Sequence, residues 1–140
     1  MTTGHIPDTE LAWAAGFFDG EGCFSLNAHA SHRKTYAVAQ MNQNDPRPLE
    51  RFRLAVGVGS VTGPYKRRTK GWSPYWAWST AKREGVAEVL RLLWPWLGPV
   101  KRGAGARALL DATGGRRENY RDGAGIVTTG HVSDNRYEED

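Results

Sequence analysis

Residues 11–24 read LAWAAGFFDGEGCF, in which an apolar, helix-like segment leads directly into Asp19-Gly20-Glu21-Gly22. Acidic side chains stabilise the start of a helix, where the macrodipole is positive, yet Asp19 and Glu21 follow the apolar positions and so stand at the opposite end. A departure from local preference of this kind often marks a functional site. The stretch therefore gives both a boundary between two elements and a candidate site.

The helix that this stretch closes is predicted from Pro7 to Phe18. Four apolar residues recur there at the spacing of one helical face, namely Leu11, Ala14, Ala15 and Phe18. Gly20 and Gly22 are expected to end the helix, because glycine adopts the left-handed conformations common at that position.

The rest of the chain alternates between strand-like and helix-like patterns. These patterns predict, in order, strands over 23–29 and 34–42, a helix over 46–56, strands near 58–66 and 74–79, a helix over 82–97 and a short helix over 101–112. This αββαββα order predicts an α+β fold with one four-stranded antiparallel sheet and helices on a single face. The fold is expected to occupy residues 1–112, and the polar, glycine-rich residues 113–140 are expected to form an irregular tail.

Five of the six tryptophans fall into two groups. Trp94 and Trp96 are predicted to be core residues. For Trp72, Trp76 and Trp78, contact with a nucleic acid and ordinary sheet packing both remain open.

Positive charge is concentrated in the middle of the chain. Residues 47–107 hold 13 Lys and Arg against 3 Asp and Glu, a net charge of +10, whereas residues 1–46 and 108–140 each carry −3. Such a concentration favours a polyanionic partner, either a nucleic acid or an acidic surface. A solvated basic surface without a partner is the alternative.

Several protein classes are excluded or disfavoured. Cys23 is the single cysteine, so an internal disulfide and a multi-thiolate zinc site are excluded. No apolar run approaches the length of a membrane span, and the first residues, MTTGHIPDTE, do not resemble a signal peptide. We therefore expect a soluble intracellular protein, cytoplasmic or organellar, with no membrane partner.

The stretch from Ala14 to Gly22 resembles the nine-residue motif that names the LAGLIDADG homing endonucleases. Ala14 replaces the first leucine, and Glu21 stands at the eighth position, where aspartate is more usual. Shorter similarities follow in the family's order: Cys23-Phe24, MNQND at 41–45, VGVGSV at 56–61, and WPWL at 94–97 before Lys101. The resemblance spans about residues 9–110 and implies the αββαββα fold with a saddle-like sheet.

A single motif is present, and in this family single-motif chains act as homodimers. The resemblance therefore implies a homodimer whose motif helices meet at the two-fold axis. It assigns Ala14, Ala15, Gly16 and Asp19 to that interface, with Asp19 bracing either the facing helix end or the turn.

The resemblance also implies active-site roles. Glu21, with Gly20 beside it, is expected to bind a divalent cation, Mg²⁺ or another such as Mn²⁺, near the scissile phosphates. Gln43 matches a position that orients the attacking water. Lys101 matches a basic residue near the metal centre, and Arg102 is its rival for this role.

Double-stranded DNA is the implied partner, and the wet face of the sheet is the implied binding surface. Polar, basic and aromatic candidates for DNA contacts occupy both hairpins: Ser25, Asn27, His29, Arg33, Lys34, Tyr36, Gln40, Asn42, Thr62, Lys66, Arg67, Arg68, Lys70 and Trp76. The implied activity is a metal-dependent, sequence-specific double-strand cut in a long, near-palindromic target.

Three other functions stay open at this point. A DNA-binding regulator of the same fold could bind without cutting. A maturase could use the same basic sheet to bind RNA, which the sequence does not distinguish from DNA. The third alternative is an interaction module that binds an acidic protein through its basic patch.

Overall fold

The computed structural model describes residues 5–29, 34–69 and 71–113. The elements are, in chain order, α1 (Asp8–Glu21), β1 (Gly22–His29), β2 (Lys34–Gln43), α2 (Pro46–Val56), β3 (Ser60–Tyr65), β4 (Tyr75–Thr80), α3 (Arg83–Leu93), the 3₁₀ turn η1 (Trp94–Trp96) and α4 (Pro99–Asp111). The predicted αββαββα order is confirmed, and the expected short last helix follows it as α4.

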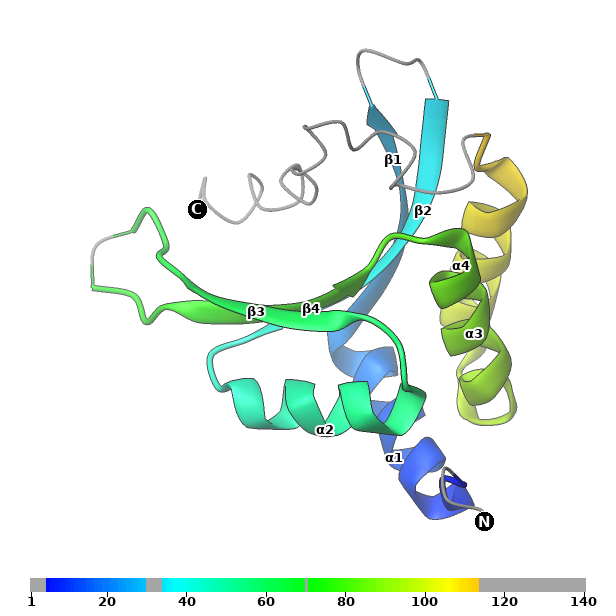
Figure 1. Cartoon of the computed structure of the whole chain (residues 1–140), viewed down its shortest axis with the longest axis horizontal. Helices are drawn as coiled ribbons and strands as arrows, with labels where there is room; N and C mark the ends of the chain where they lie inside the picture. Colours follow the sequence, from blue (N-terminus) through cyan, green and yellow to red (C-terminus); the bar gives the residue numbers. More distant parts are fainter. Residues whose placement is uncertain (1–4, 30–33, 70, 114–140) are drawn as a thin grey trace.

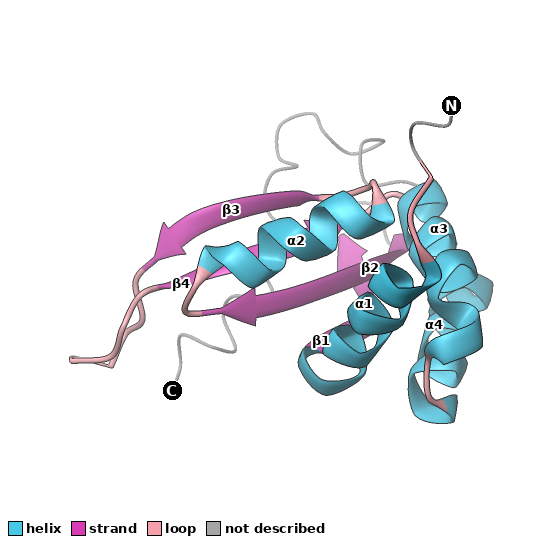
Figure 2. Ribbon diagram, turned by 90° about the horizontal axis from the view of Figure 1, so that it is seen from below, coloured by secondary structure: helices cyan, strands magenta, loops and turns pink. Residues whose placement is uncertain are grey.

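The four strands form one antiparallel sheet in the order β1-β2-β4-β3. The sheet is strongly curved, so that β1 and β2 rise steeply while β3 and β4 extend to one side (Figure 1). All four α-helices lie on the same side of the sheet, as the view from below shows (Figure 2). We call the opposite, concave side the open face. The predicted α+β architecture is therefore confirmed.

Aromatic side chains fill the space between the sheet and the helices. Phe18 of α1, Phe52 of α2 and Trp78 of β4 are fully buried. The Phe52 and Trp78 rings are 4.8 Å apart, and the Trp78 indole Nε1 donates a hydrogen bond to the Val58 carbonyl over 3.0 Å. Of the two roles left open for Trp78, the structure supports sheet packing, since this ring faces the core.

The expected inward position of Trp94 is wrong, because its side chain is 40% exposed. The predicted helix over 82–97 ends at Leu93, and Pro95 follows within the tighter turn η1. This turn rotates Trp94 away from the core, whereas Trp96 is partly buried and packs against it.

The expected end of α1 also needs correction, because the helix continues through Gly20 to Glu21. Gly22, the residue that caps it, has an extended conformation with φ −93° and not a left-handed one. A Cβ at Gly22 would lie within 3 Å of the Phe18 ring. Packing against Phe18, and not backbone conformation, therefore explains the glycine at this position.

Helix α2 follows its predicted bounds and has a well-defined cap at each end. The Asp45 carboxylate accepts a hydrogen bond from the Arg47 backbone N–H over 2.9 Å, as expected for an N-cap. The side-chain hydrogen bond from Arg47 lowers the pKa of Asp45 to about 2, so this cap stays ionised well into the acid range. Gly57 ends the helix in the left-handed region, with φ 75°.

Helix α4 begins two residues before its predicted start, with Pro99 as its first residue after Gly98. After α4, the Thr113 backbone N–H donates to the Thr35 carbonyl of β2 over 3.2 Å. The rest of the predicted tail lies outside the described residues. Among the helices that the structure describes, none combines the length and the apolar character needed to cross a membrane.

The explanation for Gly22 predicts that Gly22→Ala lowers the free energy of unfolding by about 1–3 kcal/mol, because the added methyl group displaces the Phe18 ring. Gly103→Ala in α4 is the control, since a Cβ there meets nothing within 4 Å. It should raise stability by about 0.5–1 kcal/mol through helix propensity. Denaturant unfolding measures both changes, and equal effects of the two variants would contradict the packing argument.

Candidate functional site

The last turn of α1 combines a buried ring with an exposed carboxylate. The Phe18 ring lies 4.8 Å from the Phe24 ring and 5.9 Å from the Phe52 ring, centroid to centroid. These contacts fix the end of the helix against the core. Glu21, three residues further on, is exposed at the edge of the sheet.

Gln43 meets Glu21 at this edge. Gln43 is the last residue of β2, and its amide Nε2 donates a hydrogen bond to Glu21 Oε1 over 3.1 Å. The register of the first hairpin explains the meeting, because Gly22, which follows α1, pairs with Met41 of β2. The structure thus brings together two residues that the sequence assigned to one site.

The Asp19 carboxylate is hydrogen-bonded within its own chain. Both of its carboxylate oxygens accept hydrogen bonds from the Gly98 backbone N–H, over 3.2 Å and 3.0 Å. Gly98 is the N-cap residue of α4, where unpaired N–H groups and the helix dipole favour a negative charge. The carboxylate that stands at the unfavourable end of α1 therefore stands at the favourable end of α4.

Lys101 of α4 makes a second contact with the end of α1, in which α4 is the donor of a side-chain hydrogen bond. Its Nζ donates a hydrogen bond to the backbone carbonyl of Asp19 over 3.1 Å, which places a cation at the C-terminal end of α1. Arg102 points elsewhere: its Nε donates to the Trp94 carbonyl over 2.9 Å, and its guanidinium lies 4.9 Å from the Trp94 ring centroid. Of the two rivals, Lys101 is the one beside the end of α1.

One chain offers few ligands for a metal ion. In residues 5–29, 34–69 and 71–113, no group of three or more His, Cys, Asp and Glu side chains is placed to hold one. Asp19 is committed to Gly98, which leaves the exposed Glu21 carboxylate and the backbone at exposed Gly20. These oxygen donors suit a hard divalent cation, but they supply only part of a coordination shell.

The assignment of Ala14 and Ala15 to a dimer interface needs correction. Both side chains have no exposed surface and belong to the core of the single chain. Gly16 and Gly20 are exposed instead, and a Cβ at either position would meet nothing within 4 Å. Because they are four residues apart, they lie on one face of α1 and expose its backbone.

The strand registers place several predicted DNA contacts on the open face. Phe24, Met41 and Trp78 point into the core, so their neighbours along each strand point away from it. On that opposite face Ser25 pairs with Val38, Asn27 with Tyr36, Gln40 with Ser79, and both Asn42 and Thr62 with Ala77.

Three predicted contacts do not fit this surface. Tyr36 and Gln40 are only 5% and 9% exposed, so their side chains are not available to a ligand in this structure. Trp76 pairs with Gln43, shares the side of Trp78 and packs against the core. Arg33, Lys70 and the side chain of His29 lie outside the described residues.

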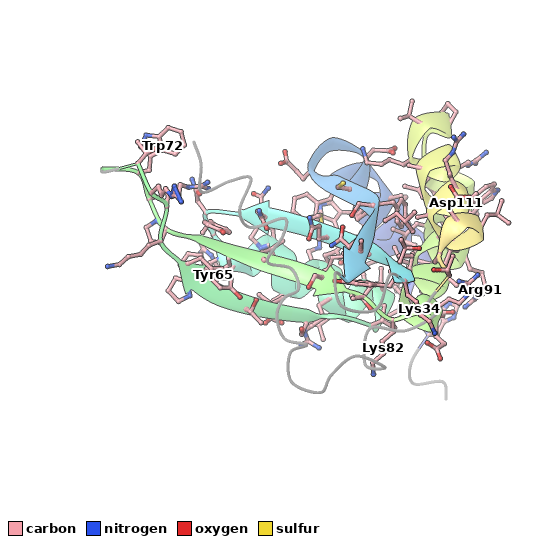
Figure 3. The ribbon with its side chains drawn as sticks, turned by 90° about the horizontal axis from the view of Figure 1, so that it is seen from above. Lys34, Tyr65, Trp72, Lys82, Arg91 and Asp111 are labelled. Carbon is pink, nitrogen blue, oxygen red and sulfur yellow. The ribbon has the colours of Figure 1, made fainter. Side chains whose placement is uncertain are left out.

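The basic residues of the second hairpin extend beyond the sheet. Lys66 and Arg68 are exposed, and Arg67 is half-buried. Trp72, 53% exposed, lies near the tip of this hairpin, beyond Tyr65 and at the opposite end of the molecule from Lys34 (Figure 3). Positive groups therefore occupy both ends of the open face.

The sequence reasoning missed two partners at these sites. Gly98 was not predicted as a partner of Asp19, because the contact uses a backbone group 79 residues away. Gly98-Pro99 is nevertheless a recognisable start of a helix. Asn44, which accepts a hydrogen bond from Arg67 over 3.2 Å, was noted only within the MNQND similarity, and no local pattern marks this contact.

The fold of this chain is similar to that of known proteins only at the level of structure. No protein-family model matches the chain, and no curated protein matches it. Solved structures do match. The homing endonuclease I-CvuI, in complex with its target, superposes with a TM-score of 0.57 at 20% identity, over 73% of this chain and 64% of that one.

Two further matches agree. The homing endonuclease I-TnaI superposes with a TM-score of 0.54 at 22% identity, over 71% of each chain. The LAGLIDADG meganuclease I-AabMI, bound to uncleaved DNA, superposes with a TM-score of 0.53 at 21% identity, over 68% of this chain and 33% of that one. The chain thus has the fold of the LAGLIDADG homing endonucleases, and it spans slightly less than two thirds of the I-CvuI chain that it matches.

The contact between Asp19 and Gly98 predicts that Asp19→Ala lowers the free energy of unfolding by about 1 kcal/mol, the usual cost of losing a helix N-cap. Asp111→Ala, at the exposed C-terminal end of α4, is the matched control and should cost little, because a negative charge is unfavourable there. Thermal and denaturant unfolding measure the difference. Equal losses in the two variants would contradict the capping role.

Proposed function

We propose that this protein is a DNA endonuclease of the homing type, which hydrolyses phosphodiester bonds in duplex DNA as a homodimer. The observation that carries the proposal is the exposed Glu21 carboxylate, held by Gln43 at the end of α1. It adjoins the exposed Gly20, which shares one face of the same helix with the exposed Gly16. A carboxylate that is fixed but exposed, next to a surface open to close approach, fits a centre completed by a second copy of the chain.

The glycine face of α1 supports the homodimer. Two helices can approach closely where neither has side chains between the backbones, a packing principle best documented in membranes but based on sterics alone. A two-fold axis through this face makes the same patch meet itself. The exposed Thr9, seven residues or about two helical turns before Gly16, extends the patch. With Gly20 at the contact, the two Glu21 side chains come to the same region.

The donors present are suited to Mg²⁺ or another hard divalent cation such as Mn²⁺. Glu21 from each subunit would hold it, with the backbone of Gly20 beside each carboxylate. A bound cation of this kind supplies charge stabilisation for the attacking and leaving oxygens of a phosphodiester hydrolysis. Since one chain offers only part of the ligand set, the dimer and the metal site are proposed together.

The other residues of the site have defined tasks in this proposal. Gln43 uses its amide nitrogen to hold Glu21, so its amide oxygen remains to accept a hydrogen bond from a water molecule and orient it. The Lys101 ammonium has three donors, of which one bonds the Asp19 carbonyl. Its charge can stabilise negative charge that develops on a phosphate.

The open face is the proposed surface for double-stranded DNA. Its polar side chains, with Ser25, Asn42 and Thr62 at the register positions described, can contact base edges in the major groove. Lys34, Lys66 and Arg68 would contact phosphates. A two-fold dimer would then favour a near-palindromic target.

Cleavage of a randomised duplex library in Mg²⁺ tests this function. The parent chain should yield cut products that share a pseudo-palindromic sequence. Glu21→Gln should reduce cleavage by about two orders of magnitude or more, because it removes the charge of the proposed metal ligand. Glu50→Gln on α2 is the matched control and should cut like the parent, since its exposed ion pair with Arg53 contributes little.

Other outcomes of this assay would contradict the proposal. Equal cutting by the parent and Glu21→Gln would remove Glu21 from the centre. Enrichment of one duplex without cutting would indicate a DNA-binding regulator. Binding of a structured RNA in preference to any duplex would indicate a maturase, and binding of neither nucleic acid would leave an acidic protein as the partner.

A further inference from the structure

Arg67 differs from the other basic residues of the second hairpin, because its guanidinium is engaged within the protein. Its Nε donates a hydrogen bond to the Ser73 carbonyl over 3.1 Å, which closes the connection between β3 and β4. Its second guanidinium nitrogen donates to the Asn44 side-chain oxygen over 3.2 Å. Arg67 therefore joins the hairpin to the segment between β2 and α2.

Two aromatic rings lie around the same guanidinium. Its central carbon is 4.7 Å from the ring centroid of Tyr75, which is fully buried, and 5.7 Å from that of Trp72. A planar guanidinium can stack on a ring while its N–H groups donate in the ring plane, and an ammonium cannot reproduce this combination. Arg67 thus has a position defined by two acceptors and a buried ring.

The neighbours of Arg67 show the opposite behaviour. Lys66 and Arg68 are exposed, and within the described residues neither takes part in a hydrogen bond or an ion pair. Their charges are available to a polyanion. Arg67, in contrast, already donates two hydrogen bonds within the protein, one from Nε and one from a terminal guanidinium nitrogen. The three adjacent cations are therefore not equivalent, although the sequence assigned all of them to DNA contacts.

The partner of Arg67 gives this contact a further consequence. Asn44 directly follows Gln43, the residue that holds Glu21. A continuous set of contacts thus runs from the hairpin through Asn44 and Gln43 to the exposed carboxylate. Movement of the hairpin relative to the end of β2 would change the distance between the basic groups and the candidate active site.

We propose that Arg67 is a positioning residue, which fixes the basic hairpin to the Gln43–Asn44 segment while Lys66 and Arg68 supply the electrostatic contact with DNA. This inference rests on the proposed function for its consequence in DNA binding. The positioning itself concerns the protein alone. The two statements can therefore be tested separately.

Charge-preserving substitutions in the full-length chain distinguish position from charge. The probe is a fluorescein-labelled duplex of 30 base pairs with mixed sequence, and binding is followed by fluorescence anisotropy over a range of salt concentrations. Arg67→Lys should weaken binding by about fivefold, close to the effect of Arg67→Ala, because the lost hydrogen bond and stacking are not restored by charge. Arg91→Lys, at an exposed position of α3 on the helix side of the sheet, is the control and should bind like the parent. Arg68→Ala should weaken binding and reduce the salt slope by about one.

A double-mutant cycle tests the role of Asn44. Asn44→Ala removes the acceptor without changing any charge, so it should reproduce most of the effect of Arg67→Lys. The double variant should bind no more weakly than Arg67→Lys alone, because both changes break the same contact. Additive losses, or parent-like binding by Arg67→Lys, would show that Arg67 acts as an ordinary phosphate contact.

Amide hydrogen exchange without DNA provides the independent readout. Arg67→Lys and Asn44→Ala should both accelerate exchange in residues 66–69 and 71–74, where the Trp72 N–H donates to the Thr69 carbonyl, while Arg68→Lys should not. If the parent fails to bind the duplex but this acceleration is seen, the proposed function is wrong and the positioning role stands. Unchanged exchange in both variants would refute the positioning role whether or not DNA binds.

Discussion

The reciprocal contact between the end of α1 and the start of α4 determines the position of the candidate site. The Asp19 carboxylate accepts hydrogen bonds from the Gly98 N–H at the start of α4. In return, the Lys101 ammonium of α4 donates a hydrogen bond to the Asp19 backbone carbonyl at the end of α1. Each helix thus receives from the other the charge that its own terminus favours. This explains why an acidic residue is found at the C-terminal end of an apolar helix.

The remaining features of the site follow from this fixed helix end. Phe18 holds the last turn of α1 against the core, and Glu21, the final residue of the helix, is exposed at the sheet edge, where Gln43 reaches it. Gly16 and Gly20 leave the adjoining helix face open. Arg67 connects the distant hairpin to the same edge through Asn44. The two acids of the motif therefore have different tasks, since Asp19 joins helices within the chain and Glu21 remains available for chemistry.

Local patterns in the sequence were sufficient to predict the order of elements, because amphipathic spacing and caps are short-range properties. Helix α2 was predicted within its observed bounds, from Asp45-Pro46 at one end and apolar spacing within. Features that depend on distant partners were not predictable. Asp19 meets a backbone group 79 residues away, Ala14 and Ala15 are buried in a core that also contains residues as distant as Leu93 and Leu97, and Tyr36 is buried on a face that alternation marks as wet. The position at the helix end marked Glu21 as a candidate, whereas its role and the residues Gln43 and Lys101 were found through the resemblance and not through periodicity.

The central claim is that two copies of the chain share one centre, to which each contributes its Glu21. Mixed dimers test it most directly. Differently tagged parent and Glu21→Gln chains are co-expressed, the dimers carrying both tags are purified, and cleavage of a supercoiled plasmid bearing the selected target is followed. The account predicts that the mixed dimer loses double-strand cutting and that the parent dimer, purified in the same way, retains it. A mixed dimer that linearises the plasmid at half the parent rate or faster would show that one chain holds a complete centre, as would full activity in a parent protein that sediments as a monomer.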